Sequence, residues 1–403
     1  MKMIALLDNT IQFYAWGSPN AIPELLGAQN PSGKPWAELW MGAHTKAPSR
    51  VSFEGQRQSL IELIRKNPHD ILGRDISERY HNKLPYLFKV LAAAKPLSIQ
   101  AHPDLAQAKE GFERENRQNI PLDAPIRNYK DDNHKPECIC ALTKFYALCG
   151  FRAISEMVGL ITTACPKGLG HELGYLRANP DSGGLKKFYT NLMTMDPAKQ
   201  KRIIDEAMQN VDKIHDQNSI IWMKKLSDEY PSDIGILSPL LFNLICLEPG
   251  QALFLPAGQL HAYLEGLGIE LMANSDNVLR GGLTAKHIDL SQLLTVVNFE
   301  PRPVDLLETR DCGVNEKLFI TPASEFVLSV VSVSEINSYH SPTDRSVEIL
   351  LCSDGEAVMQ DIGAKTSLEI KKGDSVLIPA AVAAYKIDGN AVFYKAAVPI
   401  KLP

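Results

Sequence analysis

The chain has 403 residues, of which 45% are hydrophobic and 22% are charged, with a formal net charge of −5 at pH 7. This length suits two or three domains with packed cores, and the weakly acidic balance excludes a broad basic surface. We therefore expect no nucleic-acid partner and no binding to anionic membranes. The sequence has no run of about 18 apolar residues, so we also expect no membrane-spanning helix.

The N-terminal residues and the cysteines favour a cytoplasmic protein. The segment from Met1 to Gly17 has one lysine, a short apolar run and an early acidic residue at Asp8, unlike a signal or transit peptide. Seven cysteines, an odd number, argue against a disulfide framework. Cys138 and Cys140 form a C-x-C pair without a second pair at zinc-finger spacing, so we expect reduced thiols and no cysteine-based metal site.

The first 150 residues mix helix and strand signals. A helix is predicted from Ser59 to Lys66, because Ser59 can cap an apolar face and Pro68 follows its end. From Leu87 to Ile99 the chain is apolar and rich in small and branched residues, with Pro96 inside. This pattern predicts a strand, a break and a second strand.

Helical periodicity distinguishes the middle of the chain from its two ends. Between about Ser155 and Ser232, strand-like alternation is scarce and apolar residues recur at helical spacing. The clearest run is Ile203, Ile204, Ala207, Met208, Val211 and Ile214. From about Leu241 onward, short apolar runs alternate with turn residues, as in Phe326–Val333 and Val347–Cys352. We predict a helical module inserted into a mainly β protein.

An internal repeat relates two parts of the β region. Gly250 matches Gly373 and Pro256 matches Pro379, an offset of 123 residues, and each copy has a Gly turn, an apolar strand and a Pro turn. At this offset His261 corresponds to Ala384, so only one copy has a residue able to bind a ligand. The repeat predicts two related β-barrels, one holding a site and one structural.

The first copy reads G-x5-P-x-G-x2-H and resembles the second sequence motif of the cupin superfamily, in which the His points into a jelly-roll barrel. Glu265 stands where that family usually has Asn. Taken alone, such a Gly-Pro-Gly turn before a His is more often only a turn.

A second part of a site is predicted at Ser98, Gln100 and His102, which share one face of a strand because residues i and i+2 point to the same side. Burying an amide and an imidazole is costly without a partner, and a bound metal would remove that cost. The alternative is a hydrogen-bonded polar strand end, since Pro103 follows at once.

Glu137 begins the apolar run ECICAL, and a carboxylate at the mouth of a buried strand needs a cation. A simple ion pair with Lys135 or Lys144 is one alternative. The other is a metal site, because two nitrogens and two oxygens suit zinc with an open position. That ligand set is Gln100, His102, Glu137 and His261.

The chain is similar to the type I phosphomannose isomerases in four longer strings, AELWMGAH (37–44), LFKVLAAAKPLSIQAHPD (87–104), NHKPE (133–137) and NSDNVLRGGLT (274–284). The similarity is strong over about residues 12–301 and weaker beyond them. It implies a zinc-dependent isomerase that interconverts mannose 6-phosphate and fructose 6-phosphate through a cis-enediol, with one zinc ion per chain. We also expect a monomer, although the sequence itself does not give the oligomeric state. The string GGxGxRLWP of the bifunctional type II enzymes is absent.

The resemblance also implies a role for each site residue. The zinc ligands are Gln100, His102, Glu137 and His261. The catalytic residues are His134, Lys135, Glu270 and Arg280. The substrate pocket is lined by Trp16, Glu38, Lys89, Ser98 and Tyr263. Thr45 and Ala15 depart from the family pattern without touching a ligand position.

Three questions about these residues stay open. Glu270, His134 and Lys135 are all candidates for the base that moves a proton between C1 and C2. Arg280, with Lys89 and Ser98 in support, either binds the phosphate with its planar fork or stabilises the enediolate. Trp16 and Tyr263 either line the pocket or are ordinary core residues.

The family architecture implies two cupin-like jelly-roll barrels plus an inserted helical domain, a mainly β fold. The expected limits are 1–153 for the first part of the catalytic barrel, 154–235 for the insert, 236–300 for the second part with His261, and 301–403 for a C-terminal jelly roll without a metal site.

Two other functions are compatible with a cupin barrel. A non-catalytic sugar-binding or storage protein would explain the loss of the His at Ala384, but not the Lys, Arg and Glu residues around the first copy. A cupin oxygenase or oxalate-type enzyme would use a His-rich iron or manganese site, whereas this set has only two His and includes an amide.

Overall fold

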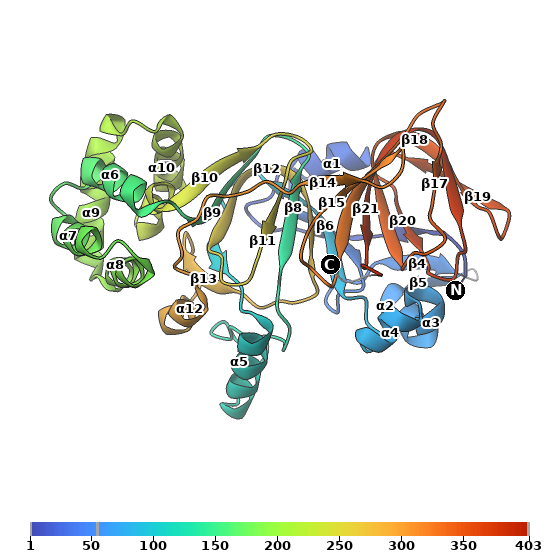
Figure 1. Cartoon of the computed structure of the whole chain (residues 1–403), viewed down its shortest axis with the longest axis horizontal. Helices are drawn as coiled ribbons and strands as arrows, with labels where there is room; N and C mark the ends of the chain where they lie inside the picture. Colours follow the sequence, from blue (N-terminus) through green and yellow to red (C-terminus); the bar gives the residue numbers. More distant parts are fainter. Residues whose placement is uncertain (1, 54–55, 401–403) are drawn as a thin grey trace.

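The computed structural model describes residues 2–53 and 56–400. It contains two antiparallel sheets side by side and a group of helices at one end (Figure 1). The helices of residues 154–229 lie at the far side of the first sheet, and the second sheet lies at the opposite end of the long axis. The predicted mainly β fold with a helical insert is confirmed.

The first sheet has ten strands, and β12 (His261–Ala273) is its centre because it pairs with four others. These four are β6 (Tyr86–Ala93), β7 (Ile99–Ala101), β8 (Glu137–Ala141) and β9 (Phe145–Phe151). The remaining strands are β2 (Thr10–Gln12), β3 (Glu38–Gly42), β10 (Phe242–Leu247), β11 (Ala252–Leu255) and β13 (Leu279–Gly282). The predicted break around Pro96 is confirmed, since β6 ends at Ala93 and β7 begins at Ile99.

The second sheet has eleven strands and contains the C-terminal part of the chain. Eight of them are β14 (Thr309–Asp311), β15 (Glu316–Phe319), β16 (Val327–Val333), β17 (Tyr339–His340), β18 (Glu348–Asp361), β19 (Thr366–Lys371), β20 (Ser375–Ile378) and β21 (Tyr385–Ala397). The other three come from the N-terminal part and are β1 (Ala5–Asp8), β4 (Arg50–Phe53) and β5 (Gln56–Ser59).

These three strands join the second sheet through β1, whose Ala5 pairs with Leu377 of β20. The expected domain limits remain a prediction, but residues 1–153 do not all belong to the first sheet. The two sheets also share one core cluster, in which Phe88 of β6 is buried together with Phe326 and Ile349 of the C-terminal region.

The helices follow the sequence signals. The helical insert contains α6 (Ile154–Ala164), α7 (Gly170–Ala178), α8 (Ser182–Thr194), α9 (Pro197–Asn210) and α10 (Gln217–Glu229). Around the sheets lie α1 (Ala21–Leu26), α2 (Leu60–Lys66), α3 (Pro68–Leu72), α4 (Arg74–Arg79), α5 (Leu105–Arg117), α11 (Ser238–Leu241) and α12 (Leu290–Val296). Short 3-10 turns cover Val211–Lys213 and Ile234–Leu237. Among the described residues, no helix is long and apolar enough to cross a bilayer.

The sequence predictions for individual helices are confirmed. Ser59 is the N-cap of α2, although its side chain makes no capping hydrogen bond within the described residues. In α9, Ile203, Ile204 and Ala207 are buried in the core of the insert, because their spacing places them on one face. All seven cysteines lie in the described ranges as free thiols.

The internal repeat is reproduced in three dimensions. Residues Ala252–Leu255 form β11, and the residues 123 positions later, Ser375–Ile378, form β20. Gly250 and Gly373 precede these strands with φ of 85° and 91°, a left-handed conformation that glycine adopts without strain. The two copies therefore have the same turn and strand, and they differ at the residue that matters for chemistry.

Candidate metal centre and active site

Strands β7 and β8 both pair with β12 and so bring distant residues together. Gln100 of β7 lies directly opposite His261, the first residue of β12. Glu137 begins β8, which pairs with the other end of β12 opposite Met272. His102 follows β7 by one residue, where Pro103 ends the strand pairing.

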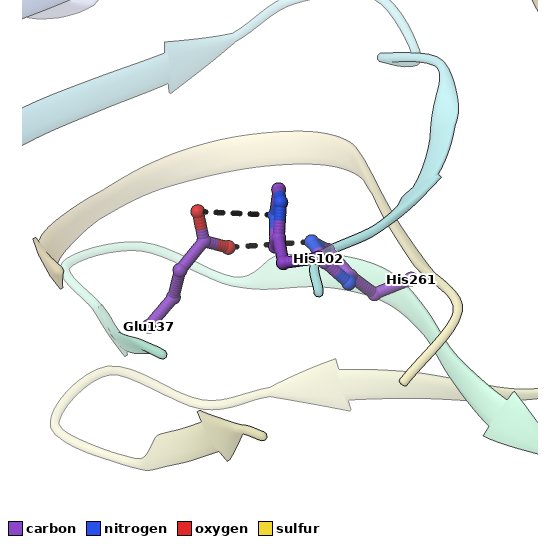
Figure 2. Close-up of side chains that lie close together, drawn as sticks. All are labelled: His102, Glu137 and His261. Carbon is purple, nitrogen blue, oxygen red and sulfur yellow. Dashed lines mark ion pairs between the residues drawn. The ribbon is translucent and has the colours of Figure 1, made fainter. Parts of the chain in front are cut away.

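His102, Glu137 and His261 converge at one point inside the first sheet (Figure 2). Nε2 of His102 lies 3.4 Å from Oε1 of Glu137, and Nε2 of His261 lies 3.2 Å from Oε2. The candidate ligand atoms lie within 4.8 Å of one another, and each side chain is only 1% exposed. Such a cluster of two imidazoles and one carboxylate has the composition of a zinc site.

Hydrogen bonds fix how the two imidazoles present their nitrogens. Nδ1 of His102 lies 2.7 Å from the carbonyl oxygen of Asn277, and Nδ1 of His261 lies 2.9 Å from that of Gln259. A carbonyl oxygen only accepts, so each Nδ1 is the donor. With Nδ1 donating to a carbonyl, Nε2 of each ring is left to face the Glu137 carboxylate, which is how metal-binding histidines present their ligand nitrogen.

The donor set is incomplete without a cation. Nε2 of His102 and Oε2 of Glu137 are buried and have no hydrogen-bond partner among the described residues. Burial and the Lys135 ammonium lower the pKa of His102 to about 4, so this ring is neutral at pH 7. Two lone pairs facing a buried carboxylate are unfavourable, and a divalent ion between them converts this into coordination. These residues fit zinc.

The side chain of Lys135 contacts this cluster, with Nζ 3.0 Å from Oε1 of Glu137. Burial alone would raise the pKa of Glu137, but the charge of Lys135 lowers it below its usual range. The ion pair considered as the alternative to a metal site is therefore present, alongside the imidazoles. The other candidate partner, Lys144, lies 3.4 Å from Glu248 instead.

Gln100 lies beside the cluster, with its amide Nε2 3.3 Å from Nε2 of His261. Rotating the terminal amide by half a turn exchanges its nitrogen and its oxygen, so the amide oxygen can face the cluster without any other movement of the side chain. Gln100 also lies opposite Arg280 of β13. Residues directly opposite on neighbouring strands share a face of the sheet, so Arg280, Gln100 and His261 form one row.

A second buried network contains Lys89, Glu270 and Glu38. Nζ of Lys89 lies 2.9 Å from Oε2 of Glu270 and 3.5 Å from Oε1 of Glu38. Trp40 donates from Nε1 to Oε2 of Glu38 at 2.8 Å, and its ring lies beneath the Lys89 ammonium. Burial alone would lower the pKa of Lys89, but the two carboxylates raise it, so Lys89 is a permanent cation.

Glu270 differs from an ordinary carboxylate. Burial raises its pKa, and the nearby charges of Glu137 and Glu38 act in the same direction against the attraction of Lys89. The hydroxyl of Tyr263 is buried without a hydrogen-bond partner among the described residues. Burial, Glu270 and Glu137 raise the pKa of Tyr263, which places this hydroxyl among the same charges.

Positive charge gathers around Arg280. Lys130 and Lys286 lie close enough for their charges to act on each other and on Arg280. Partial burial lowers the pKa of Lys130, and Lys46 and Arg280 lower it further, while Asp276 opposes them. Cations that repel one another in a partly buried group are arranged to receive an anion.

The remaining predicted residues lie at the edges of this region. His134 is held by Glu325, with 2.8 Å between Nε2 and Oε1. Tyr263 is 2% exposed and packs on Phe145, and Trp16 packs against the same apolar cluster, so both contribute to the core. Ser98 is partly exposed in the segment before β7. Glu265, the departure from the cupin motif, pairs with Lys225 on the surface.

Sequence reasoning missed five residues that shape the site, namely Trp40, Lys130, Asn277, Lys286 and Glu325. Asn277 is fully buried, orients His102 through its carbonyl, and accepts from the backbone of Lys130. Trp40 and Asn277 lie within the strings that resemble the family, and Lys130 lies just before one of them. Their position in the sequence could therefore have placed them near the site. Glu325 offered none, because it lies 191 residues from its partner His134.

Comparisons with known proteins agree with this geometry. Residues 4–154 match the model "Phosphomannose isomerase type I, catalytic domain", and residues 315–396 match "Mannose-6-phosphate isomerase, cupin domain". The chain is 40% identical over 388 residues to mannose-6-phosphate isomerase of Escherichia coli K12, covering 95% of this chain and 97% of that protein. The rat enzyme of the same name is 31% identical, with 93% of each chain covered.

Solved structures match over almost the whole chain. One is mannose 6-phosphate isomerase from Salmonella typhimurium bound to fructose 6-phosphate and zinc, with a TM-score of 0.92 and 37% identity. It covers 98% of this chain and 100% of that one. A zinc-bound holo structure of a mannose 6-phosphate isomerase gives the same TM-score, identity and coverage.

Proposed function

The chain belongs to the type I phosphomannose isomerase family, and from this premise we propose how its residues interconvert mannose 6-phosphate and fructose 6-phosphate. It is a zinc enzyme, a mannose-6-phosphate isomerase. The observation that carries the mechanism is the buried set of His102, Glu137 and His261, in which Nε2 of His102 and Oε2 of Glu137 have no hydrogen-bond partner among the described residues. Membership of this family excludes the two alternatives considered from the sequence, a sugar-binding or storage protein and a cupin oxygenase.

We assign zinc binding to His102, Glu137 and His261, with the amide oxygen of Gln100 as fourth ligand. When bound there, zinc supplies Lewis-acid polarisation of a sugar oxygen. The carbonyl groups of Asn277 and Gln259 hold the two imidazoles in the required tautomer and orientation. Lys135 balances the charge of Glu137 through its 3.0 Å contact with Oε1.

Glu270 is the proposed proton carrier between C1 and C2. An aldose–ketose isomerase must remove a proton from a carbon beside a carbonyl and return it to the neighbouring carbon. Burial raises the pKa of Glu270 above that of an ordinary carboxyl group, in the direction that favours accepting a proton. Lys89 fixes this carboxylate at 2.9 Å and stays charged throughout.

The other two candidate bases have different surroundings. Lys135 is ion-paired with Glu137, which favours an electrostatic role. Nε2 of His134 is occupied by Glu325, so opening of the sugar ring by His134 would use Nδ1. We therefore propose that His134 serves ring opening and that Glu270 serves the isomerisation step.

The phosphate is proposed to bind Arg280 together with Lys130 and Lys286. Arg280 lies in the same row as Gln100 and His261, so a substrate can reach from the metal to the guanidinium. The planar fork of arginine matches two phosphate oxygens, and two neighbouring lysines add charge. The sugar itself would lie between these cations and Glu38, Lys89, Ser98, Trp16 and Tyr263.

The direct test is a coupled isomerase assay with purified protein, first as isolated, then with a chelator, then with zinc added back. Activity should disappear with the chelator and return with zinc. Glu270→Gln tests the proton carrier, because exchange of the C2 hydrogen with solvent should fall together with turnover. Unchanged C2 exchange in Glu270→Gln would remove Glu270 from that role.

We also propose that the enzyme acts as a monomer in the cytoplasm. The proposed metal ligands and the phosphate-binding cations all come from one chain, so the site needs no residue from a second copy. Sedimentation velocity of the zinc-loaded protein should give a single species with the mass of one chain, 44.5 kDa.

A further inference from the structure

The second sheet contains a cleft that the isomerase reaction does not use. Its volume is about 540 Å³, within the range of small-ligand pockets. Its walls come from β14, β15, β16, β18 and β21, from the segments 320–326 and 342–346, and from residues 398–400 after β21. None of the residues assigned to zinc or to sugar phosphate lines it.

Buried polar side chains form one side of this cleft. Glu316 is 6% exposed, Lys395 5%, Glu348 2% and Ser329 2%. Nζ of Lys395 lies 2.7 Å from Oε1 of Glu316, and Ser329 donates to the same oxygen at 2.7 Å. Apolar groups complete the lining, among them Phe319, Phe326 and Val398. Polar groups at one side and apolar groups at the other are typical of a ligand site.

Two residues that line the cleft are the repeat counterparts of Glu137 and Glu270 in the first sheet. Glu348 pairs with Ile378 of β20, and Glu137 pairs with Leu255 of β11, the residue 123 positions before Ile378. Glu348 is therefore the repeat counterpart of Glu137. Two residues further along β18, Leu350 pairs with Lys395, as Ile139 pairs with Glu270 in the first sheet. Lys395 is thus the counterpart of Glu270.

In this second copy a lysine side chain neutralises the buried carboxylates. The Lys395 ammonium lies between Glu316 and Glu348, at 2.7 and 3.5 Å, and so neutralises carboxylates that would otherwise need a metal. Within the described residues, His102, Glu137 and His261 are the only group of metal-binding side chains of this kind. We therefore expect no metal in the second cleft.

The cleft retains unused hydrogen-bonding capacity. The two carboxylate oxygens of Glu348 lie 3.5 Å from Lys395 and 3.5 Å from Arg345, longer than ordinary charge-assisted hydrogen bonds. Nε of Arg345 is buried without a partner among the described residues, and that side chain is 3% exposed. A ligand with hydroxyl groups can donate to Glu348 and accept from Arg345.

The charges around the cleft balance. Three cations, Arg310, Arg345 and Lys395, and three carboxylates, Glu316, Asp344 and Glu348, line it, so the sum is zero. Phosphate binding needs a local excess of cations, as at Arg280, and this cleft has none. A neutral molecule that presents several hydroxyl groups matches the lining best.

We propose that this cleft binds a neutral polyhydroxylated ligand, such as a free hexose or a hexitol, at a second site separate from the zinc centre. The polar contacts would come from Glu348, Arg345 and Ser329, and the carbon skeleton would pack on Phe319 and Phe326. The C-terminal sheet would then retain the ligand-binding capacity of its repeat partner and lack its metal chemistry.

The test is calorimetric titration of D-mannitol and of D-mannose into the zinc-loaded enzyme, with fructose 6-phosphate saturating the first site. We expect one binding event per chain, with a Kd of about 1–10 mM for so small a neutral ligand. Inorganic phosphate should give no binding under the same conditions. Thr321 lines the cleft, and Thr321→Trp should fill it and weaken sugar binding at least tenfold.

The matched control is Thr366→Trp, at an exposed threonine of β19 outside the cleft, which should bind as the unaltered protein does. Unaltered isomerase activity in both variants establishes that they fold. Absence of saturable binding, binding of phosphate in place of the neutral sugars, or equal binding by Thr321→Trp would each overturn the proposal. None of these outcomes bears on the zinc-dependent isomerase activity.

Discussion

Nε2 of His134 lies 2.8 Å from Oε1 of Glu325, and this contact ties the metal-site string NHKPE to a loop of the second sheet. The loop is anchored on both sides of Glu325, since Tyr80 donates to the carbonyl of Ser324 and Phe326 is buried in the core shared by both sheets. The C-terminal sheet therefore contributes directly to the surroundings of the proposed active site.

Replacing Glu325 tests this contact. Glu325→Gln keeps the shape of the side chain and removes the charge that orients the His134 ring, so we expect kcat to fall about tenfold with a smaller change in KM. The pH profile of kcat should shift as well, which a purely structural role would not cause. Steady-state assays across pH give both values.

Glu335→Gln, in the exposed turn between β16 and β17, is the control and should leave the profile unchanged. If Glu325→Gln lowers only the melting temperature and leaves kcat and its pH profile intact, the positioning role of Glu325 is wrong.

The metal ligands should differ in their contributions to zinc affinity. His102→Ala removes a nitrogen from the buried centre, and we expect zinc affinity to fall at least 100-fold, because few ligands share the ion. Gln100→Ala should weaken binding less, since a neutral amide is the weaker ligand. Competition with a chromogenic chelator measures each affinity, with the exposed His340→Ala as control. Equal affinities in His102→Ala and His340→Ala would contradict the assignment.

The lysines near Arg280 should affect substrate binding more than turnover. Lys130→Ala is expected to raise KM for mannose 6-phosphate about 5- to 20-fold, because it removes one charge from the proposed phosphate group. Lys286→Ala should act in the same direction, and kcat should change less in both. The exposed Lys317→Ala provides the control. A loss confined to kcat would assign Lys130 to the reacting carbons instead of the phosphate.

Asp276 makes stability depend on pH. Burial would raise its pKa, but hydrogen bonds and charges from His44 and Lys46 lower it below the value of an unfolded chain. A depressed pKa stabilises the folded state above the unfolded value of about 4, and this contribution is lost as the pH falls toward the folded pKa. Asp276→Asn should therefore cost about 1–2 kcal/mol at pH 7 and less at pH 3.

Urea unfolding at both pH values measures this difference, and Asp123→Asn at an exposed site should show little change. A destabilisation of Asp276→Asn that is the same at pH 7 and pH 3 would mean that its charge is not the cause.

The elements with strong local signals could be predicted from the sequence. The face formed by Ile203, Ile204 and Ala207 requires only helical geometry, and the strands after Gly250 and Gly373 follow from one turn and a short apolar run. Gln100 and His102 share a face for an equally local reason, the two-residue period of a strand.

Long-range pairing could not be read in the same way. Ala5 pairs with Leu377, and four-residue strands such as β1 contain no information about a partner that lies hundreds of residues away. The contact of His134 with Glu325 could not be predicted for the same reason. The loop that carries Glu325 is positioned by the core shared by the two sheets, not by local sequence. The repeat did predict where the second sheet resembles the first, but not that Lys395 would stand between two carboxylates.

The central claim is that one zinc ion binds among His102, Glu137 and His261, and anomalous diffraction at the zinc edge tests it most directly. We expect a single strong peak in the anomalous difference map, about 2.0–2.2 Å from Nε2 of both histidines and from a carboxylate oxygen of Glu137. Zinc bound elsewhere in the chain, with these three side chains still facing one another empty, would contradict it.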